Sequence, residues 1–445
     1  MKQFIKSITP APLLNAYHYC LAILGALIYR SPSRKLFVIG VTGTKGKSTT
    51  SELIAAILAE AGHTVALAST IRFAVGKESE PNLFKMTMPG RFFLQKFLRQ
   101  AVGKGATHAV IEMTSEGAKQ FRHSGLALDA LVFTNLAPEH IESHGGLEHY
   151  VDAKLSLARA LARSPKRPRI VVANADDTYG KDFLNIDVEI KAPFSLKDAE
   201  PYNADDKSVR FVWPARPGRR QELFTVPLPG VFNLKNILAA MTLCDAMGVE
   251  TSTMKKALEH IGPIAGRAER VEAGQPFVVV VDYAHTPDSL RALYETYSSN
   301  LGASLLGSKS VAPRLICVLG STGGGRDTWK RPALGKIADE FCDSAYLTNE
   351  DPYDEDPQKI IDEVAGGFTR VKPRMVLNRR EAIREALKEA FTLRQAQGDQ
   401  NEITVLVTGK GTDPYLMGAK GAKEPWSDKK VVQEELKNCM TDREQ

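Results

Sequence analysis

The sequence predicts an α/β fold in which two mostly parallel sheets follow one another along the chain. From residue 36 to about residue 250, short apolar runs typical of buried strands alternate with helical patterns. A second alternation of the same kind starts at Gly266. Such alternation is typical of parallel sheets covered by helices, whose ligands lie at the carboxyl ends of the strands. Polar clusters do follow the apolar runs, which is the third observation in favour of this fold class.

Length and composition narrow the class of protein. A chain of 445 residues suits two or three domains, and 43% hydrophobic with 25% charged residues is typical of a soluble globular protein. The net charge of +6 is small, and no basic block is interleaved with aromatic residues, so we expect no nucleic-acid partner. The cysteines are scattered, odd in number and without metal-ligand spacing, which favours a reducing cytoplasm and no disulfide framework. They are Cys20, Cys244, Cys317, Cys342 and Cys439.

The first 35 residues contain one apolar segment, Leu13–Tyr29. It is shorter than the roughly 20 apolar residues that a membrane span needs, and it includes Asn15 and His18. We favour a helix that packs on the following domain. The alternative is a helix lying in the plane of a membrane surface, with a basic flank on anionic lipid. That flank consists of Arg30, Arg34 and Lys35.

The first predicted strand, Leu36–Val41, leads into a glycine-rich turn and then into a helical pattern. A strand, a turn and a helix N-terminus in this order form a phosphate site, because backbone N–H groups and the helix dipole converge on one anion. The usual P-loop spacing would place a glycine at position 41, where this chain has valine. We nevertheless predict that the turn binds ATP, or a similar nucleotide, with Mg²⁺. The predicted ligands are Gly43, Thr44, Lys45, Gly46, Lys47, Ser48 and Thr49.

Further strands and helices complete the first sheet. The predicted strands are Thr64–Ala68, His108–Met113, Ala130–Thr134 and Ile170–Asn174, and the clearest helices are Arg91–Val102 and Leu147–Ala162. Glu112 lies at a strand end, where a carboxylate suits Mg²⁺. Two histidines and two glutamates between residues 139 and 144 could suggest zinc, but that run is a loop with proline and glycine, which argues against it. Lys154 lies on a helix, where a lysine is usually solvated.

The chain then changes character. Residues 195–225 are predicted to form a small β-rich excursion, and a helix is predicted to start near residue 230. We place the domain boundaries so that residues 1–35 form a short apolar helical segment. Residues 36–262 then form a central P-loop ATPase domain and residues 263–445 a Rossmann-like C-terminal α/β domain. Residues 301–312 and 394–402 are predicted to be flexible loops.

The second sheet is predicted from four apolar runs, each followed by polar residues. The runs are Phe277–Val281, Leu315–Gly320, Ser344–Leu347 and Thr404–Thr408. The polar clusters that follow occupy residues 282–288, 320–327, 348–357 and 409–413. Any one of them could be a capped turn. Because four occur at successive strand ends, we predict a polar edge that faces a ligand.

Together these motifs resemble the Mur ligase family, and within it the UDP-N-acetylmuramyl-tripeptide synthetases. The order and rough spacing of the motifs match from residue 36 to the C-terminus, and the Asp-Tyr-Ala-His-Thr-Pro run favours the tripeptide synthetases over their relatives. The resembling segments are residues 42–48, 133–136 with Glu139 and His140, Tyr150 with Lys154, 266–269, 282–288, 324–327 with 330–332, and 409–411.

The resemblance implies an ATP-dependent amide synthesis through an acyl phosphate, by a monomer acting on a muramyl peptide and an amino acid. Lys47 and Mg²⁺ would stabilise the leaving phosphate. Glu112 and His140 would be magnesium ligands together with Ser48, and Lys154 would carry a carbamate that supports the metal. The remaining implied ligands fall into three sets. Asn236, Arg267 and Asp282 would hold the nucleotide, Thr87, Thr114, Ser115, His285 and Arg326 would face the substrates, and Glu350, Asp351, Pro352, Tyr353, Gly409, Lys410 and Asp413 would line the amino-acid site.

Two departures from the family pattern stand out. Only about 35 residues precede the first strand, where family members usually carry a domain for the UDP end of the substrate. Members that add diaminopimelate typically have Asp-Asn-Pro-Arg where this chain has Glu350-Asp351-Pro352-Tyr353. The acids between residues 350 and 356 would suit a cationic side chain such as that of lysine or ornithine, or simply solvate a loop. Diaminopimelate stays open, because its distal ammonium group is also cationic.

Three other functions stay open at this point. The chain could be a related ligase for a lipid-linked muramyl peptide, a folate polyglutamate synthetase, or an ATP-binding paralogue without catalysis. The run 282–288 argues against the folate enzyme. The presence of Lys47, Glu112, His140 and Lys154 together argues against a non-catalytic paralogue.

Overall fold

The computed structural model describes residues 10–139, 141–213, 221–298, 313–325, 327–397 and 402–444. The chain divides into two compact units. Unit 1 consists of Met1–Glu200, Val212–Glu222 and Lys235–Ile261, and unit 2 of Pro201–Phe211, Leu223–Leu234 and Gly262–Gln445.

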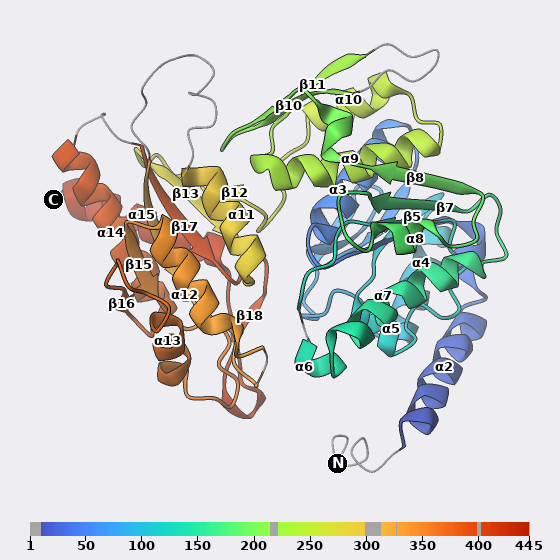
Figure 1. Cartoon of the computed structure of the whole chain (residues 1–445), viewed down its shortest axis with the longest axis horizontal. Helices are drawn as coiled ribbons and strands as arrows, with labels where there is room; N and C mark the ends of the chain where they lie inside the picture. The colour runs from blue at the N-terminus through green and yellow to red at the C-terminus, as the bar shows by residue number, and fades with distance from the viewer. Residues whose placement is uncertain are drawn as a thin grey trace. The chain divides into compact units, whose positions relative to one another are not determined.

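Unit 1 is built on an eight-stranded sheet (Figure 1). In sheet order its strands are β4 (Glu78–Pro81), β3 (Arg72–Val75), β2 (Val65–Ala68), β5 (His108–Glu112), β1 (Phe37–Thr42), β6 (Ala130–Phe133), β7 (Ile170–Asn174) and β8 (Ile190–Phe194). From β2 to β8 neighbouring strands are parallel, and β3 and β4 are antiparallel additions at one edge. The five strands predicted here are confirmed, because runs such as Val38–Thr42 are buried on both faces.

Helices cover both faces of this sheet. The apolar faces of α4, α5, α7 and α8 form one core with the strands, while α3 packs on β1, β2 and β5 and contacts α10 (Figure 1). The helical segments up to residue 261 are α2 (Ala11–Ile28), η1 (Pro32–Lys35), α3 (Lys47–Glu60), α4 (Arg91–Gly103), α5 (Ser115–Lys119), α6 (Ile141–His144), α7 (Leu147–Ala162), α8 (Gly180–Leu184), η2 (Leu196–Ala199), α9 (Gly230–Ala246) and α10 (Thr251–Glu259).

The apolar N-terminal segment is the helix α2. Its small residues Ala22 and Ala26 are buried, Gly25 lies against the ring of Phe92, and the helix packs on α4. The prediction of a helix that packs on the following domain is therefore confirmed. Over the part of the chain that the structure describes, no helix is both long and apolar enough to cross a membrane.

The predicted β-rich excursion is confirmed as a small three-stranded sheet. Its order is β11-β10-β9, and the rings of Phe211 and Phe224 stack in it with centroids 5.2 Å apart. The strands are β9 (Tyr202–Ala204), β10 (Val209–Trp213) and β11 (Glu222–Val226).

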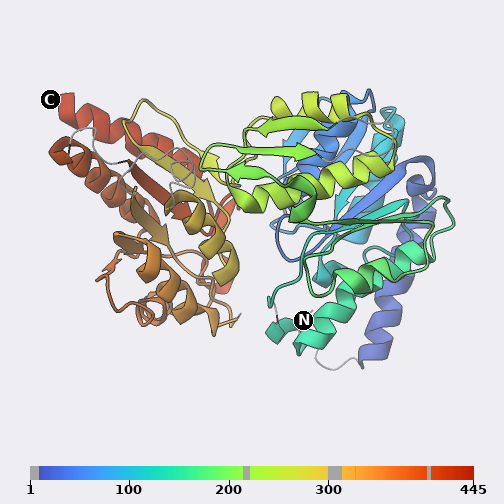
Figure 2. The ribbon, with the colours of Figure 1, turned by 45° about the horizontal axis from the view of Figure 1, so that its top comes forward.

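Unit 2 has three layers, with α14 and α15 on one side of a six-stranded sheet and α11, α12 and α13 on the other (Figure 2). The four strands predicted here are confirmed, and neighbouring strands from β13 to β16 are parallel. In sheet order the strands are β12 (Glu269–Arg270), β13 (Val278–Asp282), β17 (Ile403–Thr408), β14 (Arg314–Leu319), β15 (Ser344–Leu347) and β16 (Arg374–Met375). The other elements are α11 (Pro287–Ser298), α12 (Lys330–Phe341), α13 (Pro357–Ala365), α14 (Arg379–Gln397), the hairpin β18 (Tyr415–Met417) with β19 (Lys423–Pro425), η4 (Ala419–Gly421) and α15 (Asp428–Glu444).

The loop prediction for residues 394–402 is wrong at its start. The helix α14 continues to Gln397, because Leu393 still packs on the core of unit 2 and the residues that follow are good helix formers. Residues 398–401, and the predicted loop 301–312, lie outside the described residues.

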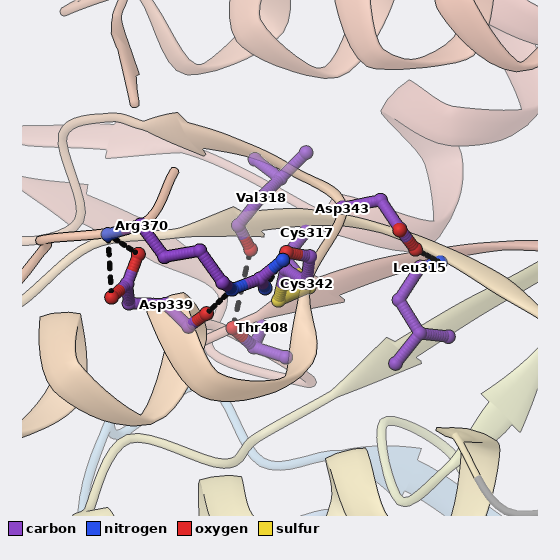
Figure 3. Close-up of a disulfide and its surroundings, with 8 residues drawn as sticks. All are labelled: Leu315, Cys317, Val318, Asp339, Cys342, Asp343, Arg370 and Thr408. Carbon is purple, nitrogen blue, oxygen red and sulfur yellow. Dashed lines mark hydrogen bonds between the residues drawn. A yellow bond between two sulfur atoms is a disulfide. The ribbon is translucent and has the colours of Figure 1, made fainter. Parts of the chain in front are cut away.

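The prediction that no cysteines are bridged is wrong for one pair. Cys317 on β14 and Cys342, directly after α12, form a disulfide with their Cα atoms 6.1 Å apart (Figure 3). Arg370 lies next to this pair. Its guanidinium donates to the carbonyl of Cys342 at 2.6 Å, and its backbone N–H donates to the carboxylate of Asp339. The two cysteines are 25 residues apart in the sequence. They come together only because the chain runs through α12 and then returns to the sheet before β15. No spacing rule could have predicted this pair.

Candidate active site

The turn after β1 has the conformation that a phosphate loop needs. Gly43 has φ +146° and Gly46, the N-cap of α3, has φ +80°. A Cβ atom at Gly43 would collide with the Oγ1 of Thr134, and one at Gly46 with the side-chain amide of Asn236. Both glycines are therefore required for the backbone to pass between β6 and α9, with its N–H groups at the start of α3.

The loop is held from the side by the end of β6. The N–H of Lys45 donates to Asn135 Oδ1 at 2.8 Å, and Asn135 Nδ2 donates back to the Lys45 carbonyl at 3.0 Å. The Lys45 ammonium also pairs with Glu139 at 2.8 Å. Asn135 lies in the segment 133–136, one of those that resemble the family, but the sequence predicts no role for its side chain. The structure makes it the side chain that fixes the loop.

Two lysine ammonium groups converge on the same loop. Lys47 Nζ donates to the carbonyls of Gly43 and Thr44 at 3.0 and 2.9 Å, and Lys154 Nζ donates to the Gly43 carbonyl at 2.7 Å. Lys154 is only 2% exposed, and its Nζ lies 4.8 Å from the centre of the Tyr150 ring. Burial, and secondly the charge of Lys47, lower the pKa of Lys154 well below its usual range. Lys154 is therefore no solvated surface lysine.

Glu112 lies at the end of β5, beside Val41 of β1. It is fully buried, and both carboxylate oxygens accept hydrogen bonds from Thr70, one from its N–H at 3.0 Å and one from its hydroxyl at 2.9 Å. The Thr70 hydroxyl also contacts that of Thr87 at 2.8 Å. Thr70 orients the carboxylate, and nothing in the sequence pointed to it.

The oxygen donors at this edge fit Mg²⁺. Ser48 and Thr49 are buried in the first turn of α3, next to the strand pair that ends in Glu112. Among the described residues, no group of three or more His, Cys, Asp or Glu side chains could hold a metal ion by itself. Mg²⁺ needs no such group, because it is usually bound by one or two carboxylates together with substrate phosphates. His140, also expected as a ligand, lies outside the described residues.

The other predicted substrate contacts of unit 1 are only partly brought together. Thr114 caps α5 through a hydrogen bond from the N–H of Gly117 at 3.0 Å. Ser115 lies next to it, and its hydroxyl is 3.1 Å from His144 Nε2. Thr87 instead lies beside Thr70, whose hydroxyl contacts its own. Thr87 is thus linked to Glu112 only through Thr70, and Ser115 lies beside His144.

The predicted nucleotide contacts are distributed over both units. Asn236 lies in unit 1, beside Gly46, whereas Arg267 and Asp282 lie in unit 2. The carboxylate of Asp282 accepts the N–H groups of Ala268 and Ala284, both at 2.6 Å, and burial raises its pKa although Arg267 acts in the opposite direction. The Arg267 guanidinium lies over the ring of Tyr283, 4.6 Å from its centre.

In unit 2, the ends of β15 and β17 hold a buried charge cluster. Lys410 is fully buried, and its Nζ donates to both oxygens of Asp351 at 2.9 and 3.0 Å and to Asp413 at 3.0 Å. Asp351 also accepts the N–H of Met417 at 2.8 Å. Three residues that were predicted to line the amino-acid site therefore lie together, but they bind one another.

Most of the neighbouring acids also have partners within the protein. Glu355 pairs with Arg331 at 2.7 Å, Asp354 accepts the N–H of Lys420 at 2.6 Å, and Asp356 caps α13. Glu350 is different. One of its oxygens accepts the hydroxyl of Thr322 at 2.8 Å, but the Oε2 atom is buried and, within the described residues, has no hydrogen-bond partner.

The loops after β14, β15 and β17 hold several buried oxygens that lack partners among the described residues. The Cα of Gly409 lies so close to Glu350 Oε2 that a Cβ there would collide with it. The hydroxyls of Ser321 and Thr412, at the ends of β14 and β17, are also buried and without partners among the described residues. A ligand with several N–H donors, such as an ammonium group, would satisfy such oxygens.

The other predicted contacts of unit 2 that the structure describes lie in loops that follow its strands. Tyr353, which follows Pro352, has φ +52° and donates its N–H to the Met417 carbonyl at 3.2 Å. His285 Nδ1 is 2.7 Å from the Tyr283 carbonyl. Arg326 lies outside the described residues.

Comparison with protein families decides the class of this chain. The Mur ligase middle domain matches residues 41–244, and the domain described as Mur ligase, glutamate ligase domain, matches residues 266–411. The chain belongs to the Mur ligase family. This Mur ligase is thus an ATP-dependent ligase, and Gly43 and Gly46 of its phosphate loop lie in the matched middle domain.

Individual relatives extend over almost the whole Mur ligase chain. It is 36% identical to a UDP-N-acetylmuramyl-tripeptide synthetase of Roseiflexus sp., over 94% of this chain and 82% of the relative. It is 33% identical to a UDP-N-acetylmuramoyl-L-alanyl-D-glutamate–2,6-diaminopimelate ligase of Syntrophomonas wolfei subsp. wolfei, over 94% of this chain and 81% of the relative. A solved structure of a ligase with the latter name shares the fold with a TM-score of 0.58 and 26% identity, over 91% of this chain and 78% of that one.

Proposed function

We propose that this Mur ligase adds a diamino acid, meso-diaminopimelate or L-lysine, to UDP-N-acetylmuramoyl-L-alanyl-D-glutamate in peptidoglycan precursor synthesis. The muramyl substrate is supported by the relatives with that activity in their names. The observation that carries the amino-acid part is the buried, unpartnered Oε2 of Glu350 at the end of β15, within the described residues. An ammonium group would supply its missing donor, and both candidate amino acids have one at the end of the side chain.

The chemistry divides into two steps. The glutamate carboxylate of the muramyl peptide attacks the γ-phosphorus of ATP, which forms an acyl phosphate and releases ADP. The amino group of the diamino acid then attacks the acyl carbon, expels phosphate, loses a proton and leaves an amide. Phosphorylation is needed because a free carboxylate is a poor electrophile, and Lys47 would stabilise the charge on the transferred phosphoryl group.

Mg²⁺ would be held by Ser48 and Glu112, together with His140, and would neutralise charge on the nucleotide phosphates. We infer that the neutral amine of Lys154 reacts with carbon dioxide to give a carbamate and a proton, which places an anion that supports the metal site at this buried position. Its burial at the Gly43 carbonyl and its lowered pKa support this role, because the neutral amine is the form that adds carbon dioxide.

The nucleotide and substrate contacts complete the proposal. Asn236, Arg267 and Asp282 would hold the adenosine part and a phosphate of ATP, and Thr87, Thr114, Ser115, His285 and Arg326 would face the substrates. We also propose that the enzyme acts in the cytoplasm as a monomer. A peripheral membrane contact through residues 13–29 belongs to this proposal, because much of α2 is apolar and exposed.

The activity is tested by incubating the pure protein with ATP, Mg²⁺, the UDP-muramyl dipeptide and each of diaminopimelate, lysine and ornithine. We expect phosphate release that depends on the amino acid, and a tripeptide product in mass spectrometry. ATP binding without product from any of the three amino acids would refute the proposed substrates.

The Glu350→Gln variant tests the amino-acid site. It keeps the size of the side chain but removes the charge, so we expect KM for the diamino acid to rise about ten- to a hundredfold, the range for losing a hydrogen bond to a charged group. KM for ATP should change little. The Asp354→Asn variant is the matched control, because Asp354 is exposed and bonded to the Lys420 N–H. Equal effects of the two substitutions would contradict the assignment.

A further inference from the structure

We propose that α2 and the loop Leu83–Met86 form a membrane-docking surface that binds anionic phospholipid. This inference rests on the peripheral membrane contact of the proposed function. It adds the kind of lipid that is bound and a second segment that contacts the membrane.

The exposed face of α2 is a continuous apolar stripe. Leu13, Tyr17, Leu24, Leu27 and Ile28 are all exposed, and Leu13 and Leu27 are 63% and 65% exposed. Their spacing of four, seven and three or four residues places them on one side of a helix, while the buried Ala22 and Ala26 face the protein. Figure 1 shows that the N-terminal half of α2 extends past the neighbouring helices of unit 1. The apolar stripe of α2 is therefore exposed to water along its length.

The loop Leu83–Met86 adds a second apolar element. Leu83, Phe84 and Met86 are 57%, 49% and 44% exposed. The Phe84 ring packs on Phe93 of α4 with centroids 4.7 Å apart. At the start of the same helix, Arg91 contacts His18 of α2 at 3.0 Å. Loop and helix thus flank the same end of α4. Together they supply most of the large exposed hydrophobic side chains of unit 1, and patches of this kind mark interaction sites.

The charge pattern selects lipid over a partner helix. Residues 1–36 contain five Lys and Arg residues and no Asp or Glu. Arg30, Arg34 and Lys35 are exposed directly after the apolar stripe, where they would meet anionic headgroups. A helical partner, including a second copy of α2, would normally be selected by charges beside the apolar seam, and α2 has no charged residue between Ala11 and Ile28.

The test is co-sedimentation of the full chain with vesicles of phosphatidylglycerol and phosphatidylethanolamine, and with vesicles of phosphatidylcholine alone. We expect binding to the anionic vesicles only, weakening as salt rises. The double variant Leu24→Glu/Leu27→Glu, on the exposed stripe, should lower the vesicle partition coefficient at least about tenfold. The triple variant Arg30→Glu/Arg34→Glu/Lys35→Glu should lower it similarly and remove the salt dependence.

Leu223→Glu is the matched control, because Leu223 is 58% exposed but lies on β11, away from α2 in the chain. It should leave vesicle binding unchanged. All variants should keep the far-ultraviolet circular dichroism and the ligation rate on the water-soluble UDP substrate. Ligation without vesicle binding would overturn this inference alone, and vesicle binding without ligation would overturn the proposed substrates alone.

Three other results would also overturn the membrane-docking surface. The first is unchanged vesicle binding of Leu24→Glu/Leu27→Glu. The second is a dimer in analytical ultracentrifugation that this double variant dissociates, which would assign the stripe to a second copy of the chain. The third is an unshifted spectrum, in the presence of anionic vesicles, of a polarity-sensitive fluorophore on Cys20. This cysteine is exposed on α2, whereas Cys244 and Cys439, which are also outside the disulfide, are buried.

Discussion

Replacing Lys154 by alanine is expected to lower the ligation rate at least about a hundredfold, the scale of losing a group that supports a metal site or a developing charge. The Nζ atom is buried and lies 2.7 Å from the carbonyl of Gly43 in the phosphate loop. In the proposed mechanism this position carries an anion, so added formate or acetate should enter the space and restore part of the rate. Phosphate release and tripeptide formation are measured with and without these carboxylates.

Two comparisons make the Lys154 result specific. Lys181→Ala removes an exposed lysine from α8, in the same unit, and should leave the rate unchanged. A Lys154→Ala enzyme of unchanged activity would exclude the carbamate role. If the variant lost activity together with its native circular dichroism, and carboxylates restored neither, Lys154 would instead be a structural contact of the loop.

The sequence was sufficient for the elements with strong local signals. The turn around Gly43 and Gly46 is recognisable because an apolar strand precedes it and a helix follows, and each part is encoded within about ten residues. The same holds for the parallel strands, whose apolar runs are buried on both faces. Short antiparallel strands such as β3 and β4 have no such run, since β4 is exposed along its whole length.

The geometry of the site could be predicted only in part, because its partners are distant in the sequence. Thr70 and Glu112 are 42 residues apart, and Lys45 and Asn135 are 90 apart. The acidic run 350–356 illustrates the consequence. Its composition predicts a pocket for a cation, yet most of its acids are satisfied by the protein itself, and only the structure identifies Glu350 as the acid with a free buried oxygen among the described residues.

Lys410 at the centre of that region leads to the second large expected effect. Replacing it by methionine should lower the free energy of unfolding of unit 2 by about 3–5 kcal/mol, the cost of leaving buried charges without their partner. Two carboxylates, Asp351 and Asp413, pair with this one ammonium group, and Lys410 itself is fully buried. The change is measured as a shift of the urea midpoint, followed by tryptophan fluorescence, because two of the three tryptophans, Trp329 and Trp426, lie in unit 2.

The origin of this instability can be separated from a packing defect. Lys430→Met breaks an exposed pair with Glu434 in the same unit and should cost less than about 1 kcal/mol. Adding Asp351→Asn to Lys410→Met should recover part of the lost stability, because it removes one of the two stranded charges. If the double variant is no more stable than Lys410→Met, then the shape of the lysine stem, and not its charge, holds the ends of β15 and β17 together.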